Sequence, residues 1–152
     1  MADTMSKEQR SKTMGAIRAQ SKLENLFSKS LWKRGLRYRK NVRKLKGTPD
    51  IVIQKYKIVI FIDSCFWHGC PLHFKRPKSN QDFWDKKIAR NKERDKEIDE
   101  YYIEKGWNLK HIWEHEIHAD IESTADETME FINTIKTTHS SVRKEATESH
   151  TP

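Results

Sequence analysis

Two short groups of residues in this chain combine side chains that could do chemistry. The first contains both cysteines, Cys65 and Cys70, followed by His73. Thiolates and imidazoles are the preferred ligands of zinc, and a structural zinc site holds four of them. The spacing therefore predicts a structural zinc site whose fourth ligand comes from elsewhere. The histidines available for that place are His115, which we favour, and the alternatives His111 and His118.

The same residues also allow two interpretations without a metal. Cys65 and Cys70 could be buried free thiols beside a surface histidine, or they could form a disulfide. The N-terminal sequence lacks the apolar core of a signal peptide, and close cysteines in such a chain bind metal more often than they pair. A metal would also order a loop that has little apolar mass of its own.

The second group consists of acidic residues and a histidine near two β-rich segments. Asp50 opens one segment, Asp63 ends the next, and His68 follows shortly after. Carboxylates bind Mg²⁺, and such ions can activate water and stabilise charge on a scissile phosphate. A histidine can act as general acid or base because its pKa lies near neutrality. The pattern predicts a nuclease-type site, to which Glu24 could contribute from a preceding helix.

Each of these acids also has an ordinary structural interpretation. Asp50 follows a proline, where aspartate often serves as a turn or cap residue. Asp63 could simply end a strand. Glu24 is the last residue of Ser21-Lys22-Leu23-Glu24, which is a capping-box pattern. By pattern alone the catalytic and structural interpretations both stay open.

Aromatic residues lie close to both groups. Phe66 and Trp67 separate Cys65 from His68, and Trp84 follows the loop. Aromatic side chains can wedge between base steps, and a mispaired step opens at a lower cost. For Phe66 and Trp67 a wedge and a core position remain equal alternatives. For Trp84, on one face of an expected helix, a core position is favoured.

The charge of the chain is unevenly distributed. The net charge is +8, but residues 1–47 hold 14 Lys and Arg against three acidic residues, whereas the remainder holds 16 against 19. A basic N-terminal third predicts contact with a polyanion such as nucleic acid, although a merely soluble basic surface is the alternative. There is no apolar run long enough to cross a membrane.

The elements expected to position these groups follow from periodicity and capping signals. A flexible basic arm (1–19) and a disordered tail (137–152) should flank one folded domain (20–136). We expect an α/β fold with a small mixed sheet flanked by helices. Its elements are a helix at 22–34, an irregular basic segment at 36–47, a hairpin of 50–54 and 57–62, a loop at 63–80, a helix at 81–104, a strand at 107–113 and a helix opened by a second capping box at 124–127.

Several stretches of the sequence, together spanning about residues 8–136, resemble the very short patch repair endonucleases. The most specific is Cys65-Phe66-Trp67-His68-Gly69-Cys70-Pro71. It directly follows Val59-Ile60-Phe61-Ile62-Asp63-Ser64, which also matches. The other matching residues are Gly47-Thr48-Pro49-Asp50-Ile51-Val52, the set Phe83, Trp84, Lys87, Ile88, Asn91, Arg94 and Asp95, then Gly106-Trp107, Ile112-Trp113-Glu114 and the N-terminal Arg10-Ser11-Lys12-Thr13-Met14. The resemblance implies a restriction-endonuclease-like α/β fold with a zinc-braced loop. It also implies Mg²⁺-dependent nicking on the 5′ side of the thymine in a T:G mismatch.

The resemblance further implies roles for residues at matching positions. Asp50 and the backbone carbonyl of Ile62 would bind Mg²⁺, His68 would be the catalytic histidine, and Glu24 would act through water on the metal. The residues implied to contact DNA are Phe66, Trp67 and Trp84 as the wedge, with Lys12 and Met14 reaching the minor groove. Structural zinc would be held by Cys65, Cys70, His73 and His115.

Three positions depart from the family pattern. Ile62 stands where a threonine can occur, which matters little if only its carbonyl binds metal. His115 stands where a cysteine is common, and two cysteines with two histidines remain an acceptable zinc site. Asp63 stands where a second histidine can occur. The second acid–base partner is therefore open, and Asp63 could bind metal instead.

The resemblance also implies a cellular setting. T:G mismatches arise when 5-methylcytosine deaminates, which implies a functional link to a cytosine methyltransferase and to a repair polymerase. We expect a monomeric bacterial enzyme of the cytoplasm that acts on double-stranded DNA at the nucleoid. Two other functions are retained as alternatives: a restriction-type or structure-specific nuclease on the same scaffold, and a non-catalytic zinc-braced DNA-binding module.

Overall fold

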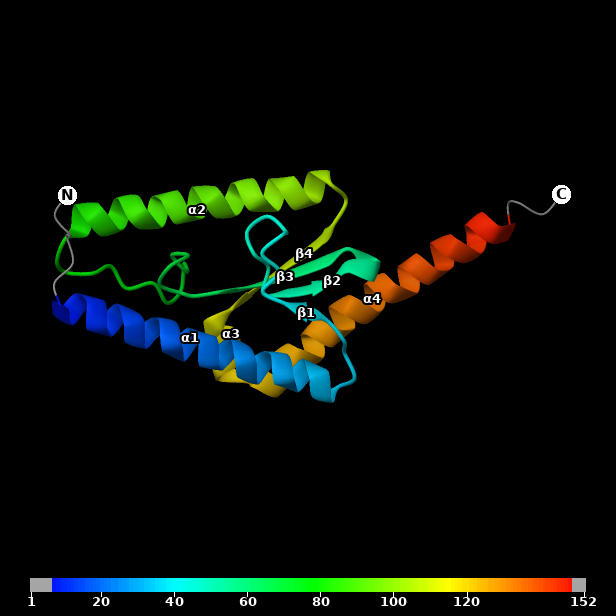
Figure 1. The fold of residues 1–152 in the computed structure, drawn as a ribbon, viewed down its shortest axis with the longest axis horizontal. Helices are drawn as coiled ribbons and strands as arrows, with labels where there is room; N and C mark the ends of the chain where they lie inside the picture. The colour runs from blue at the N-terminus through cyan, green and yellow to red at the C-terminus, as the bar shows by residue number, and fades with distance from the viewer. Residues whose placement is uncertain (1–6, 149–152) are drawn as a thin grey trace.

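A four-stranded sheet with helices on both faces forms the body of the protein (Figure 1). The computed structural model describes residues 7–148. The strand order is β1-β2-β3-β4, in which β1, β2 and β3 are antiparallel neighbours and β4 lies parallel to β3. The elements are α1 (Lys7–Lys33), β1 (Arg39–Lys40), β2 (Ile51–Ile53), the 3-10 turn η1 (Gln54–Tyr56), β3 (Ile58–Asp63), α2 (Gln81–Glu104), β4 (Asn108–Trp113), α3 (Glu114–Ala119) and α4 (Ile121–Glu148).

Strand β3 is the centre of the core. All six of its residues are buried, as its continuous apolar sequence predicts for a strand covered on both faces. Since successive side chains point to opposite faces, Ile58, Ile60 and Ile62 pack with α1, α3 and α4, whereas Val59 and Phe61 pack with α2. The sheet is therefore the middle layer of three, and the predicted hairpin, α/β class and mixed sheet are confirmed.

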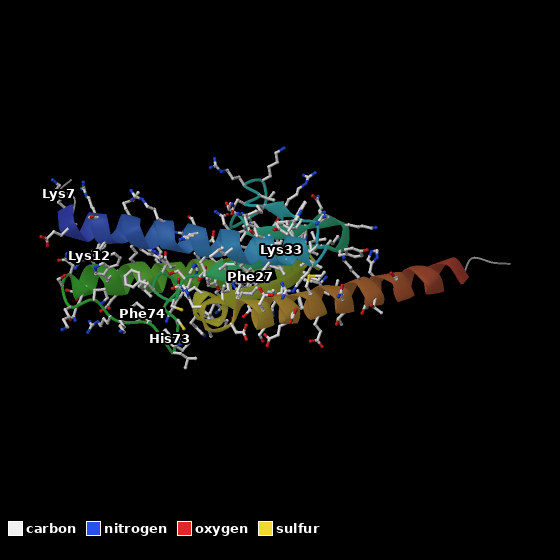
Figure 2. All side chains as sticks on the ribbon, turned by 90° about the horizontal axis from the view of Figure 1, so that it is seen from below. Lys7, Lys12, Phe27, Lys33, His73 and Phe74 are labelled. Carbon is white, nitrogen blue, oxygen red and sulfur yellow. The ribbon has the colours of Figure 1, made fainter. Side chains whose placement is uncertain are left out.

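Helix α1 begins at Lys7, so the predicted helix start near residue 22 is wrong, and residues 7–19 of the expected flexible arm are helical. Ser21 to Glu24 lie inside the helix and do not cap it. Lysine, arginine, glutamine and methionine have favourable helix propensity, and extending a packed helix requires no new nucleation. Lys7 and Lys12 lie on the part of α1 that extends beyond the sheet, whereas Phe27 lies where α1 covers it (Figure 2). Residues 1–6 of the expected arm lie outside the described residues.

The second capping-box prediction also fails, because α4 begins at Ile121. Asp120 is the residue that caps this helix: its carboxylate accepts a hydrogen bond from the Ser123 backbone N–H at 3.1 Å. The buried Thr124 hydroxyl instead donates within the bundle, 2.9 Å from the carbonyl oxygens of Glu116 and Asp120. The helix continues to Glu148, so residues 137–148 are helical where a disordered tail was expected. Residues 149–152 lie outside the described part.

The basic segment between α1 and β2 is more ordered than expected, and it positions the start of β2. Two of its residues form β1, and Val42 and Leu45 pack against the cluster that contains the buried residues of α2. The Tyr102 hydroxyl donates to the Lys46 carbonyl at 2.5 Å. Gly47 has φ +78, and a Cβ there would lie 2.9 Å from the Ile98 side chain, so this turn requires glycine. The predicted helix at 81–104 is confirmed as α2, and the strand predicted at 107–113 as β4. No helix in the described residues is both long and apolar enough to span a membrane.

Candidate active site and thiol cluster

Asp50 and Asp63 meet at one end of the sheet. Because β2 and β3 are antiparallel, the start of β2 lies beside the end of β3. One carboxylate oxygen of Asp50 accepts a hydrogen bond from the Ile62 backbone N–H at 2.7 Å. Asp63 is the last residue of β3 and is only 6% exposed. Two acids separated by a hairpin in the sequence therefore become neighbours.

A single cleft collects all four residues predicted to be catalytic. Glu24 reaches it from α1, Asp50 and Asp63 from the sheet, and His68 from the loop after β3. Trp67, Arg94 and Asp95 also line this cleft. The cleft thus combines carboxylates, an imidazole, a guanidinium and an indole ring, which are groups that can contact a metal, a phosphate and a base.

The electrostatics around Asp50 favour a bound cation. Burial and then the negative charge of Glu24 raise the pKa of Asp50 to about 7, although the Ile62 N–H partly offsets them. An acid that retains its proton near neutrality for lack of positive charge is a good position for a divalent ion, which would restore the carboxylate. The donor set at this end of the sheet therefore fits Mg²⁺.

His68 is held by a second acid on α2. Its Nδ1 lies 2.5 Å from Oδ2 of Asp95, and its Nε2 lies 3.9 Å from Oδ1 of Asp63. Burial lowers the pKa of His68, but the hydrogen bond to Asp95 and the charge of Asp63 outweigh it and raise the pKa. The geometry leaves Nε2 as the nitrogen that faces Asp63 at the end of β3.

Asp95, Asp99 and Asn91 are not among the residues whose roles were predicted from the sequence. The signal was present, because these residues are four apart and lie on one face of the predicted helix. Asp95 contacts His68, and the Asn91 side chain donates to the Trp67 carbonyl at 3.0 Å. Asn91 and Asp95 therefore hold the loop after β3 against α2.

His111, one of the alternative zinc ligands, lies instead between two carboxylates. Its Nδ1 is 2.7 Å from Asp63 and its Nε2 is 2.6 Å from Asp99. Burial lowers the pKa of His111, but Asp63 and Asp99 raise it to about 9. Since His111 and Phe61 pair across parallel strands, both side chains point toward α2.

A second cluster joins the two cysteines to His115. The sulfur atoms of Cys65 and Cys70 lie 3.3 and 3.6 Å from Nδ1 of His115, and the three ligand atoms lie within 4.8 Å of one another. The cysteines are not bonded to each other, so the disulfide alternative is absent from this structure. The His73 ring lies 4.4 Å from the His115 ring between centroids, on the loop shown in Figure 2. The predicted ligand His73 is exposed and lies outside this group of three ligand atoms, and two thiols with one imidazole are three of the four ligands that a structural zinc site needs.

The backbone supports this cluster. The Cys65 N–H donates to the carboxylate of Glu114 at 2.9 Å, and the Cys70 N–H donates to the Cys65 carbonyl at 2.9 Å. Burial is the main reason that the pKa of Cys65 rises to about 11. His118, the other alternative ligand, is exposed and lies outside the three-residue cluster found in the described part of the chain.

The aromatic residues form a third cluster beside the cleft. The centroids of Phe66 and Trp67 are 5.1 Å apart, and Trp84 lies 5.2 and 5.8 Å from them. Trp84 is 6% exposed, as a core position requires, whereas Phe66 and Trp67 are half-buried. Trp84 thus supports two rings that remain partly accessible.

The N-terminal part of α1 carries Lys12 and Met14. Both residues are exposed, and Met14 is 51% exposed. In Figure 1, α1 and α2 run in the same direction, and their N-terminal ends extend beyond the sheet. An exposed, positively charged helix end at the side of the molecule that carries the loop after β3 suits contact with a polyanion.

The acidic cleft, the acid-held histidine and the partly exposed aromatics on an α/β scaffold are the features of a nuclease. Comparison with known proteins supports this class. The family model described as DNA mismatch endonuclease Vsr matches residues 2–73. The type II nicking enzyme V.HpaIIP of Haemophilus parainfluenzae is 46% identical over 115 residues, which are 73% of this chain and 82% of that protein.

Two further relatives agree. A type II nicking enzyme of Neisseria meningitidis serogroup A is 43% identical over 77% of this chain and 85% of its own length. The DNA mismatch endonuclease Vsr of Escherichia coli is 39% identical over 75% of this chain and 74% of its own length. The chain belongs to the Vsr family of DNA mismatch endonucleases, which confirms the family and the enzyme class predicted from the sequence.

Proposed function

We propose that this endonuclease nicks one strand of duplex DNA on the 5′ side of the thymine in a T:G mismatch, in a reaction that requires Mg²⁺. The observation that carries the proposal is the convergence of Asp50, Asp63 and His68 in one cleft, next to partly exposed aromatic rings. A site for hydrolysis thus adjoins side chains able to hold an opened base step. We further propose that the three-layer scaffold is of the restriction-endonuclease type.

Asp50 and the Ile62 backbone carbonyl would hold the metal. When bound, Mg²⁺ would activate water and neutralise charge on the scissile phosphate. Glu24 lines the same cleft as Asp50 and would add its negative charge and accept hydrogen bonds from water on the metal. Both carboxylates are half-buried, and the lower effective dielectric of such a site strengthens their attraction for a cation.

His68 would transfer a proton at Nε2. Asp95 holds the other ring nitrogen and so orients the ring. Because the acids around His68 raise its pKa, the imidazolium form is favoured, and this form suits a general acid that protonates the leaving oxygen. Asp95 is in this proposal a positioning residue, since it acts through His68.

Phe66 and Trp67 would enter the base stack at the mismatch, with Trp84 supporting them from below. The Asn91 hydrogen bond fixes the backbone of Trp67 and reduces the entropy lost when DNA binds. A mispaired step costs less to unstack, so the wedge favours mismatched sites. Lys12 and Met14 would contact the minor groove from α1.

Cys65, Cys70, His115 and His73 would hold a structural zinc ion. The observation behind this assignment is the close approach of two sulfur atoms and an imidazole nitrogen, with a second imidazole alongside. The ion would fix the loop between β3 and α2, which carries both His68 and the aromatic wedge. Its role would be to position these residues, without a part in the chemical step.

The cellular setting remains as predicted from the resemblance. We propose a monomer that works on DNA in the bacterial cytoplasm, downstream of cytosine methylation and upstream of a repair polymerase. Residues 20–136 would form the nuclease domain proper.

A nicking assay on labelled duplexes tests the proposal. The panel contains a T:G duplex with varied flanks, the matched duplex and a branched duplex, each with and without Mg²⁺. We expect a single nick in the thymine strand of the T:G duplex, and no nick with Asp50→Ala. Preferential cleavage of matched or branched DNA would favour the restriction-type or structure-specific alternative. Binding without cleavage in Mg²⁺ and in Mn²⁺ would favour the non-catalytic module.

A further inference from the structure

A chain of alternating acids and imidazoles crosses the end of the sheet. Asp99 contacts His111 at 2.6 Å, His111 contacts Asp63 at 2.7 Å, and Asp63 lies 3.9 Å from His68. The chain ends at Asp95, the partner of His68. It links α2, β4, β3 and the loop after β3, so it joins the helix to the catalytic cleft through side chains alone.

The two oxygens of Asp63 face different imidazoles. Oδ2 is paired with Nδ1 of His111, and Oδ1 is the oxygen nearest Nε2 of His68. The Asp63 side chain is 9% exposed, so water cannot replace these partners easily. His111 thus provides the close positive partner that a buried carboxylate needs, while His68 is the more distant one.

The orientation of His111 is also constrained. Both of its ring nitrogens are hydrogen-bonded, and its ring stacks on Phe61 at 5.3 Å between centroids with an angle of 19°. A ring held by a stack and two carboxylates has little freedom to turn. It therefore fixes the rotamer of Asp63, which lies two residues after Phe61 on the same face of β3.

We propose that His111 is a positioning residue for nicking, which holds Asp63 as an oriented carboxylate beside His68. The proposal rests on the nuclease function of the cleft described above. This gives Asp63 a role toward His68: Oδ2 is bonded to His111, and Oδ1 faces His68 Nε2 at 3.9 Å. The second histidine of the site thus comes from β4, a strand about fifty residues further along the chain.

Removal of the His111 ring nitrogens leaves Asp63 buried with only its more distant partner. Such a carboxylate is no longer held in one rotamer and can turn away from His68, which then loses its negative neighbour on the cleft side. The proton transfer at His68 should slow, whereas the DNA-contacting surfaces stay in place. The defect should therefore appear in the rate of the chemical step and not in DNA affinity.

The test is a double-mutant cycle between His111→Phe and Asp63→Asn, measured as single-turnover nicking of saturating T:G duplex. Phenylalanine keeps the stack on Phe61 and removes both hydrogen bonds. In the wild-type background we expect His111→Phe to slow nicking by about 10- to 100-fold, as for other residues that orient catalytic groups. In the Asp63→Asn background the same change should slow nicking less than about twofold, because no carboxylate remains to be held.

Two controls separate positioning from damage to the fold. His111→Gln keeps an N–H donor and should recover part of the rate. Ile132→Val, in the core on the opposite face of the sheet, lowers stability without touching the chain and should nick at the wild-type rate. DNA affinity, measured without divalent cation, should change less than about twofold in every variant.

Wild-type nicking by His111→Phe, or an equal loss in both backgrounds, would overturn the proposal. A failure of the proposed function can be told apart from a failure of the His111 proposal, because the wild-type enzyme would then show no preference for T:G over matched DNA. In that case the same cycle, measured on whichever duplex is cleaved, still decides the role of His111.

Discussion

The Asp50 carboxylate should destabilise the fold when no metal is bound, and Asp50→Asn tests this. Its pKa is about 7 in the folded protein and 3.8 ordinarily. Because the folded state binds the proton more tightly than the unfolded state, stability falls as the pH rises from 3.8 to about 7 and then stays low. Asparagine has no charge to bury, and its amide oxygen can still accept the Ile62 N–H.

The size of the effect follows from the two pKa values. Each tenfold difference in proton affinity is worth about 1.4 kcal/mol, so the free energy of unfolding at pH 8 is lowered by about 4 kcal/mol. With a urea dependence of about 2 kcal/mol per molar for a small domain, Asp50→Asn should raise the unfolding midpoint by roughly 2 M. Near pH 4 the substitution should raise the free energy of unfolding by less than about 1 kcal/mol, since folding then removes little charge from Asp50.

The assay is urea unfolding followed by circular dichroism at pH 4, 6 and 8, in buffer free of divalent cations and of chelator. Glu127→Gln, an exposed acid on α4, is the matched control and should change the midpoint little at any pH. Added Mg²⁺ should stabilise the wild type and not Asp50→Asn. The same substitution should lower nicking by roughly 1000-fold, which is the several kcal/mol that a metal supplies to the transition state.

An Asp50→Asn protein that is no more stable than wild type at pH 8 would show that burial of the Asp50 charge does not destabilise the fold. A gain of equal size at pH 4 and pH 8 would show the same, because the gain must follow the ionisation of Asp50. A gain in stability together with full nicking activity would show that Asp50 is buried without a catalytic purpose.

Three further predictions concern the thiol cluster, the wedge and His111. Elemental analysis should find about one zinc per chain in protein purified without chelator, and Cys65→Ser should lose zinc, thermal stability and activity together; a loss of activity alone would contradict a structural role. Trp67→Ala should reduce the preference for T:G over matched DNA by about tenfold or more, measured by competition binding, since one aromatic–base stack is worth about 1–3 kcal/mol. The pKa of His111, about 9 against the ordinary 6.5, means that its stabilising effect is complete below pH 6.5 and is lost as the pH rises through 9. Between pH 6 and 10 the free energy of unfolding of wild type should therefore fall by on the order of 3 kcal/mol relative to that of His111→Phe. Parallel stability curves for the two proteins would show that the contacts of His111 with Asp63 and Asp99 do not stabilise the fold.

Local sequence patterns were sufficient to predict the helices and strands whose residues interact mainly with their own neighbours in sequence. The apolar run of β3, the turn that forms the hairpin and the periodicity of α2 all predict elements that the structure contains. Capping patterns were less informative. Ser21-to-Glu24 and Thr124-to-Glu127 resemble helix starts, yet the chain before each is already helical. A serine or threonine caps a helix only if the residues before it leave the helical conformation.

The sequence by itself determined the family and the chemistry of the site, because the order Cys-Phe-Trp-His-Gly-Cys-Pro lies within one short loop. It also placed Asp50 and Asp63 at the ends of adjacent strands. What only the tertiary structure decided is how those acids are partnered. His111 is 48 residues from Asp63 and 12 from Asp99, and His68 is 27 from Asp95. Such pairs depend on the parallel register of β3 with β4 and on the packing of α2 across the sheet. The spacing of Asp95 and Asp99 places them on one face of a helix, but no local pattern shows what that face packs against.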